Sequence, residues 1–151
     1  MRYVDGFVIP VPKKNLRACA RMAKKACVLR REHGAIDTKE CSGDDLRAAF
    51  GVPFPRMMKL KPGETVVFSY IVYKSRAHRD RVNAEVMNDP RVEDMCDPKT
   101  MPFDGKRMVY GGFKVLKEIG EVPMDRIATL HRCDRVGGGL AFLSPYSTMT
   151  S

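Results

Sequence analysis

The chain has 151 residues, 44% of them hydrophobic and 30% charged, and a formal net charge of +9. This length suits one domain with a substantial core better than two. No apolar stretch approaches the roughly 20 residues that cross a bilayer. The amino terminus carries an early acid and no long apolar segment, so we expect no signal peptide, no membrane partner and a cytoplasmic location. The positive charge favours anionic partners without choosing among them.

The first half of the sequence predicts a strand, a long helix and a second strand. Residues 2–11 form an apolar strand that two prolines end, and a helix follows from about residue 13 to residue 33. Gly34 is suited to end that helix, because glycine readily adopts the left-handed conformation found there. Residues 35–42 then form a more polar strand. Small and apolar residues recur at helical spacing and give the helix one apolar face: Leu16, Cys19, Ala20, Ala23 and Cys27.

The second half predicts the same strand–helix–strand order after a long connection. Residues 43–64 are a long connection rich in glycine and proline, and residues 65–73 are the strongest strand of the chain. Ser75 is a suitable N-cap for a helix that ends near Asp89. A polar loop, residues 91–105, leads into a last strand over residues 106–117. The order β-α-β-β-α-β predicts an α+β, ferredoxin-like domain with a four-stranded antiparallel sheet.

Two helices cover only one face of such a sheet, yet both faces are apolar. In the third strand Val67 and Ile71 point to one side, while Phe68 and Tyr70 point to the other. We expect Phe68, Tyr70 and Tyr110 to share the uncovered face. Exposure of so large an apolar patch to water is unusual in a soluble monomer. The chain is therefore predicted to pair with a second copy of itself as a homodimer.

Two adjacent glycines in the last strand need an explanation, because glycine weakens a strand unless something approaches the backbone. Gly111 and Gly112 lie on opposite faces of the sheet. We expect Gly111 to face the first helix, where it allows close approach or leaves a hollow. Gly112 is then expected on the uncovered face, beside the partner or a small ligand.

Several segments resemble the YbaA-like family of small bacterial proteins. They are YVDGFVIPVP, EHGA, ECSGDD, GETVVFSYIVY, MNDPR and MPFDGKRMVYGGF, and they span residues 2–117. The resemblance implies a domain of unknown function in the dimeric α/β-barrel superfamily, and it brings no catalytic residues. It places the domain at residues 1–117 and leaves residues 118–151 as an extension that we expect to be flexible.

The candidate catalytic residues are few. Asp44 and Asp45 form an acidic pair suited to acid–base work, although such a pair in a glycine-containing loop also suits a plain turn. His33 is a candidate base, and it also fits as a cation at the end of the first helix. The three histidines show no i,i+4 pair, and the five cysteines show no Cys-x-x-Cys pair. We therefore expect no metal site, no cofactor and reduced, structural cysteines.

Three functions remain open at this point. The preferred one is a homodimer that binds a small molecule between sheet and helices, as a cofactor-free monooxygenase- or isomerase-like enzyme would. The second is RNA binding through the basic first helix and the aromatic third strand, since RNA-recognition motifs share this order of elements. The third is a structural or interaction protein without chemistry. The predicted ligand pocket or dimer face comprises Phe68, Tyr70, Tyr110, Gly111 and Gly112.

Overall fold

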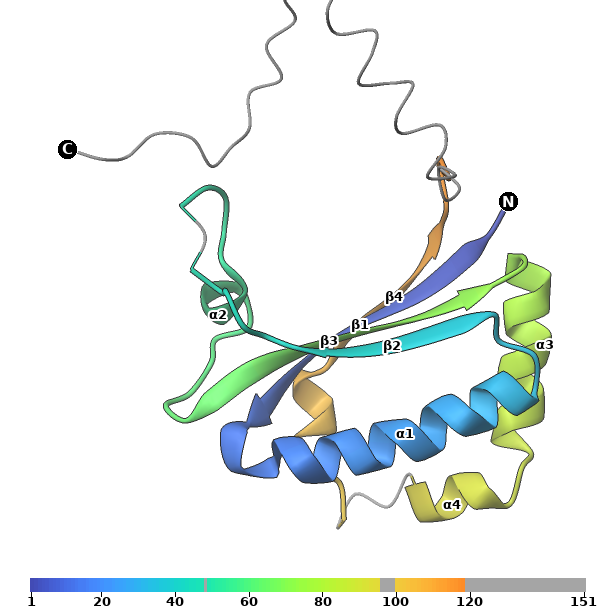
Figure 1. The fold of residues 1–151 in the computed structure, drawn as a ribbon, viewed down its shortest axis with the longest axis horizontal. Coiled ribbons are helices and arrows are strands. Elements are labelled where there is room, and N and C mark those ends of the chain that lie inside the picture. Colours follow the sequence, from blue (N-terminus) through green and yellow to red (C-terminus); the bar gives the residue numbers. More distant parts are fainter. Residues whose placement is uncertain (48, 96–99, 119–151) are drawn as a thin grey trace, which may run out of the picture. The chain divides into compact units, whose positions relative to one another are not determined.

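A single antiparallel sheet carries the domain, with the strands in the order β2-β3-β1-β4. The computed structural model describes residues 1–47, 49–95 and 100–118. The strands are β1 (Tyr3–Pro12), β2 (Asp37–Ser42), β3 (Glu64–Tyr73) and β4 (Val109–Lys114). The helices α1 (Leu16–Glu32), α3 (Arg76–Met87) and α4 (Arg91–Met95) lie on one side of the sheet (Figure 1). The predicted ferredoxin-like fold is confirmed.

The predicted helix ends are also confirmed. Gly34 follows α1 with φ of +109°, a conformation that side chains rarely adopt. The Ser75 hydroxyl accepts a hydrogen bond from the backbone N–H of His78 at 3.2 Å and so caps α3. Two short helices, α2 (Phe54–Met57) and α4, lie where the sequence predicted only connections. The 3₁₀ turns η1 (Lys13–Asn15) and η2 (Gly105–Arg107) precede α1 and β4.

The core lies between the sheet and its helices, in two clusters of buried residues. One is built around Leu29, Tyr73 and Val82, where α1 and α3 meet β3. The other contains Val11, Cys19 and Val67, under the start of α1. The alternation predicted for β3 is confirmed, because Val67 and Ile71 are buried on the helix side while Phe68 is 42% exposed on the other.

The two glycines of β4 lie on the faces opposite to those expected. Gly111 pairs with Gly6 and Gly112 with Asp5, and directly paired residues of antiparallel strands share a face. Asp5 is buried on the helix side, so Gly112 lies there too, below the ring of Tyr3. Tyr110 pairs with Phe7 and also lies on the helix side, not beside Phe68. The sequence shows alternation within a strand, but only the register between strands decides which face is covered.

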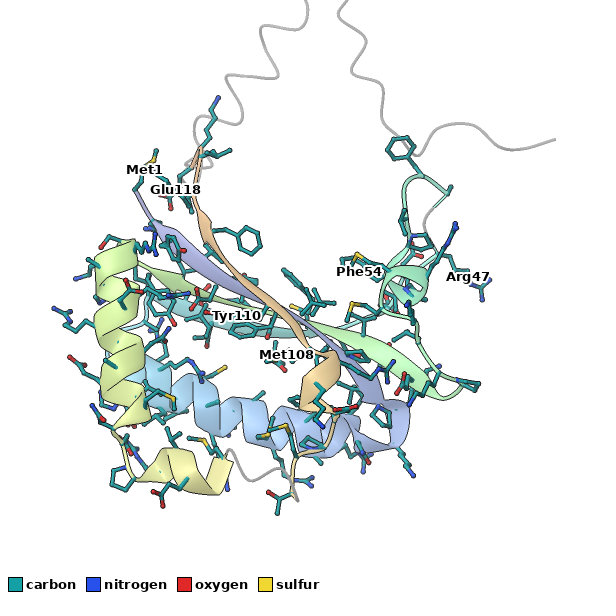
Figure 2. All side chains as sticks on the ribbon, turned by 180° about the vertical axis from the view of Figure 1, so that it is seen from behind. Met1, Arg47, Phe54, Met108, Tyr110 and Glu118 are labelled. Carbon is teal, nitrogen blue, oxygen red and sulfur yellow. The ribbon has the colours of Figure 1, made fainter. Side chains whose placement is uncertain are left out.

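The other face of the sheet, here called the bare face, is apolar, and none of the helices α1, α3 and α4 covers it. Phe68, Val109 and Phe113 on this face are between 42% and 59% exposed. Residues 49–60, here called the arm, contain α2 and lie on the same side of the sheet as the bare face (Figure 1). The arm adds further exposed apolar side chains, namely Phe50, Val52, Phe54 and Met57. Figure 2 shows Phe54 on the side away from α1 and α3.

The chain divides into two units, Met1–Leu116 and Lys117–Ser151. Of the second unit only Lys117 and Glu118 are described, so the predicted flexible extension at residues 118–151 lies outside the described residues except for Glu118. Within the described part of the chain, no helix is both long and apolar enough to cross a membrane.

The place of Gly112 under Tyr3 leads to a stability prediction. A Cβ at residue 112 would lie 2.4 Å from the Tyr3 hydroxyl oxygen and 2.9 Å from its ring, whereas one at Gly111 would meet only the Phe113 ring at 3.4 Å. We expect Gly112→Ala to lower the free energy of unfolding by about 1–2 kcal/mol, because the Tyr3 ring must move. Gly111→Ala should cost much less. Urea unfolding of both variants tests this, and an equal loss would contradict the assigned faces.

Candidate functional site

A cavity lies beneath α1 because the sheet-facing side chains of this helix are short. Ala23, Ala26 and Cys27 point toward strands whose own residues do not fill the space, and a cavity of about 110 Å³ results. Phe7, Ile9 and Ile71 from the sheet form its floor. The hollow between helix and sheet that the sequence suggested is present, although Gly111 does not line it.

A second cavity, of about 200 Å³, lies between the sheet and α3. Its lining includes Asp5, Asn83 and Tyr110, so it is more polar than the first. The two cavities share three lining residues, namely Phe7, Arg30 and Ile71. They are therefore neighbours on the helix side of the sheet, with Arg30 at their junction.

Arg30 is a cation that lines both cavities, whereas Lys39 lines only the first and pairs with Asp37 at 2.7 Å. Its Nε atom is buried and makes no hydrogen bond, and its Nη1 makes a long one to the carbonyl oxygen of Ala26 at 3.4 Å. Among the described residues no carboxylate forms an ion pair with this guanidinium. A buried donor without an acceptor is costly, so the site is suited to receive an acceptor atom from outside.

A groove beside the first cavity lies between α1 and β2, and its lining includes Cys19 and Glu40. Glu40 also lines the first cavity. Loss of water around the carboxyl group raises the pKa of Glu40. Burial, together with the Glu40 charge 4.0 Å from its sulfur, raises the pKa of Cys19 to about 11. Cys19 is therefore a protonated thiol at neutral pH and a poor nucleophile. Cys41, which neighbours Glu40 in sequence, lies on the opposite face of β2.

A buried carboxylate holds α3 against the sheet. Asp5 is 1% exposed and accepts hydrogen bonds from the Arg79 Nε atom at 2.9 and 3.0 Å. The same guanidinium donates from Nη2 to the Tyr110 hydroxyl at 2.7 Å and lies over the Tyr3 ring. Asn83 extends the network, because it contacts Asp5 and accepts a hydrogen bond from the Tyr73 hydroxyl at 3.2 Å. Burial raises the pKa of Tyr73 to about 12, so this hydroxyl remains a donor.

The candidate catalytic residues do not meet in one place. His33 lies at the end of α1, with Nε2 3.1 Å from Asp89 and Nδ1 3.5 Å from Glu85, and so links α1 to the end of α3. Asp44 and Asp45 are exposed in the connection that follows β2. None of these three residues lines either cavity. In the described part of the chain, no group of three potential ligands for a metal ion is present.

The residues predicted for a ligand pocket or dimer face are divided between the two sides of the sheet. Phe68, Tyr70 and Gly111 belong to the bare face, whereas Tyr110 and Gly112 belong to the helix side. Tyr70 is also among the residues that line the first cavity. Tyr110 lines the second cavity and stacks on Phe7 with ring centroids 5.0 Å apart. Its hydroxyl accepts a hydrogen bond from Arg79 on this side of the sheet.

Sequence reasoning missed Arg30 and Asp5, although both left a signal. An aspartate in the middle of an apolar strand is unusual, and it indicates a buried charge with a partner. Arg30 follows Cys19, Ala23 and Ala26 at spacings of four, three and four residues, which places it on the inward face of the helix.

Comparison with known proteins gives a family match and several relatives. The family model described as "Protein of unknown function (DUF1428)" matches residues 2–105. The Uncharacterized protein YbaA of Escherichia coli (strain K12) is 44% identical over 114 residues, which cover 76% of this chain and 96% of that protein. The protein of the same name from Shigella flexneri matches equally well.

Two solved structures show weaker similarity. A mutant of SnoaB, a cofactor-independent oxygenase from Streptomyces nogalater, is 13% identical with a TM-score of 0.48 and covers 80% of this chain and 98% of that one. A dimeric ferredoxin-like protein from an uncultured marine organism is 10% identical with a TM-score of 0.49 and covers 79% of this chain and 100% of that one.

The Asp5–Arg79 pair is open to a direct test. Asp5→Asn should lower the free energy of unfolding by about 3 kcal/mol. It removes the buried negative charge that compensates the desolvated guanidinium of Arg79. Asp80→Asn is the matched control: Asp80 also pairs with Arg79, but its side chain is 53% exposed, and the loss should stay below about 1 kcal/mol. Urea unfolding measures both values, and similar losses would show that Asp5 is not the anchor.

Proposed function

The chain belongs to the DUF1428 family, as its motifs predicted, and we propose that it is a homodimeric protein that binds a small, mostly apolar molecule between its helices and its sheet. The observation that carries this proposal is the cavity beneath α1, where an unpartnered guanidinium nitrogen adjoins an apolar lining. An apolar hollow with few polar groups is the usual form of a small-molecule site.

The size of the two cavities limits the ligand. The volumes of about 110 and 200 Å³ are comparable to the roughly 150 Å³ apolar cavity that accepts a benzene molecule in another protein. A ligand with a single ring, or a compact aliphatic molecule, fits this range.

The superfamily resemblance extends the proposal to a cofactor-free oxygenase- or isomerase-like reaction. Both reactions begin by moving a proton on the bound substrate, which requires a group in the cavity that accepts or donates a proton. Glu40 lines the first cavity and has a raised pKa, and these features support it as that group. The alternative is binding without turnover, which would follow if an activity assay detected no reaction.

The bare face supports the homodimer. Its exposed Phe68, Val109 and Phe113, together with the apolar side chains of the arm, form the kind of surface that proteins bury against a partner. A second copy is the partner we propose, because pairing two such faces around a twofold axis covers both at once. RNA stacking on Phe68 and Tyr70 would compete for the same surface, and no observation on the described residues favours it.

Ligand binding in the cavity predicts a specific pattern of thermal shifts. Small aromatic and lactone compounds should raise the melting temperature of the wild-type chain. Ala26→Leu places extra atoms in the cavity and should abolish the shift. Ala84→Leu, on the exposed face of α3, is the control and should retain it. A broad panel without any shift in the wild-type chain would contradict the proposal.

The dimer face predicts a second pattern. A carboxylate at residue 68 would be buried without a partner in the dimer, so Phe68→Glu should raise the dissociation constant at least about tenfold. Val28→Glu makes the same change on the exposed side of α1 and should leave association unchanged. Sedimentation over a range of concentrations distinguishes them. Dissociation by Val28→Glu alone would place the interface on the helices instead.

A further inference from the structure

Arg30 is held in an environment that favours an anionic ligand. It lies on the inward face of α1 at the junction of the two cavities, and its buried Nε atom has no acceptor. Arginine stays charged in proteins, so this cation cannot relieve its position by losing a proton. Its Nε atom needs an acceptor that the described residues do not supply.

The nearby carboxylates do not meet that need. Asp5 already accepts hydrogen bonds from Arg79 and lies within 3.5 Å of Asn83. Glu40 forms no ion pair with Arg30 among the described residues; loss of water raises its pKa, and the charge of Arg30 opposes that rise only in part. Lys39 also lines the first cavity, but its ammonium group already pairs with Asp37 at 2.7 Å. Phe7, Ile71 and Cys27 supply apolar lining near Arg30. Among the described residues, the guanidinium at the junction therefore has no ion-pair partner in direct contact, and its Nε atom has no acceptor.

Resting on the proposed function, we propose that the ligand class is a small hydrophobic carboxylate, with its ring or aliphatic body beneath α1 and its carboxylate on Arg30. The guanidinium offers planar, adjacent donors that match the two oxygens of a carboxylate. The apolar floor of Phe7, Ile9 and Ile71 receives the body of the molecule. Both ends of such a ligand find complementary surfaces in the same hollow.

The probes are benzoate and its neutral isostere benzamide, with affinity measured by calorimetry on the full chain. A charge-assisted hydrogen bond is stronger than a neutral one, so the wild-type chain should bind benzoate about tenfold more tightly than benzamide. Arg30→Met keeps an apolar stem of similar length and should remove that preference. Arg21→Met, at an exposed position of α1, is the matched control and should preserve it.

A melting curve of Arg30→Met without ligand checks that this variant is folded. Arg30→Met should be at least as stable as the wild-type chain, because it removes a buried donor that has no acceptor. Arg30→Lys, which keeps the charge but loses the planar fork, should bind benzoate with intermediate affinity.

The outcomes separate this inference from the proposed function. If benzoate and benzamide bind equally, or if Arg30→Met retains the preference for benzoate, the carboxylate inference is wrong and binding in the cavity still stands. If neither compound binds the wild-type chain, the carboxylate inference is overturned. The proposed function also falls if the wider panel of neutral compounds gives no thermal shift.

Discussion

One-sided coverage of an apolar sheet is the constraint on which the rest of the structure depends. A single layer of helices shields one face of the sheet, while the strands carry large apolar residues on both. Burial of apolar area is the main favourable term in folding and in most association. The bare face therefore still has area to bury, and a partner surface is the straightforward way to bury it.

The covered face is incompletely filled for a different reason. In the middle of α1 the side chains that face the sheet are alanine and cysteine, and they are too short to fill the space above the strands. The Asp5–Arg79 pair holds α3 in place beside it, because neither charge can leave its partner without a large cost. With α3 held in this way, the space under α1 persists as two neighbouring cavities. A protein interior is normally close-packed, and hollows of this kind commonly serve binding.

The sequence was sufficient for the order of the elements and for several of their ends. Alternation in β3, the cap at Ser75 and the positive φ at Gly34 all follow from local chemistry, and each is present. The assignment of faces in β4 was not available in the same way. Alternation within one strand is local, whereas the pairing of Gly112 with Asp5 is set by contacts between distant segments.

The site was the harder part to predict, because its residues do not form a local motif. Asp5 and Arg79 are 74 residues apart in the chain, and their pairing requires the fold. Arg30 has two readings in the sequence, as a cation that suits the end of a helix and as a member of the inward stripe. The acidic pair Asp44–Asp45 drew attention through its chemistry, yet it lies in an exposed connection away from both cavities. A motif shows which chemistry is present, and only the packing shows whether it faces a cavity.

The central claim is that the bare face is covered by a second copy of the chain. The most direct measurement is the mass of the full wild-type chain in solution, determined by light scattering during size-exclusion chromatography over a range of micromolar concentrations. The account predicts a mass near twice the 17.0 kDa of one chain. A mass of one chain at every concentration, with the protein folded, would contradict it.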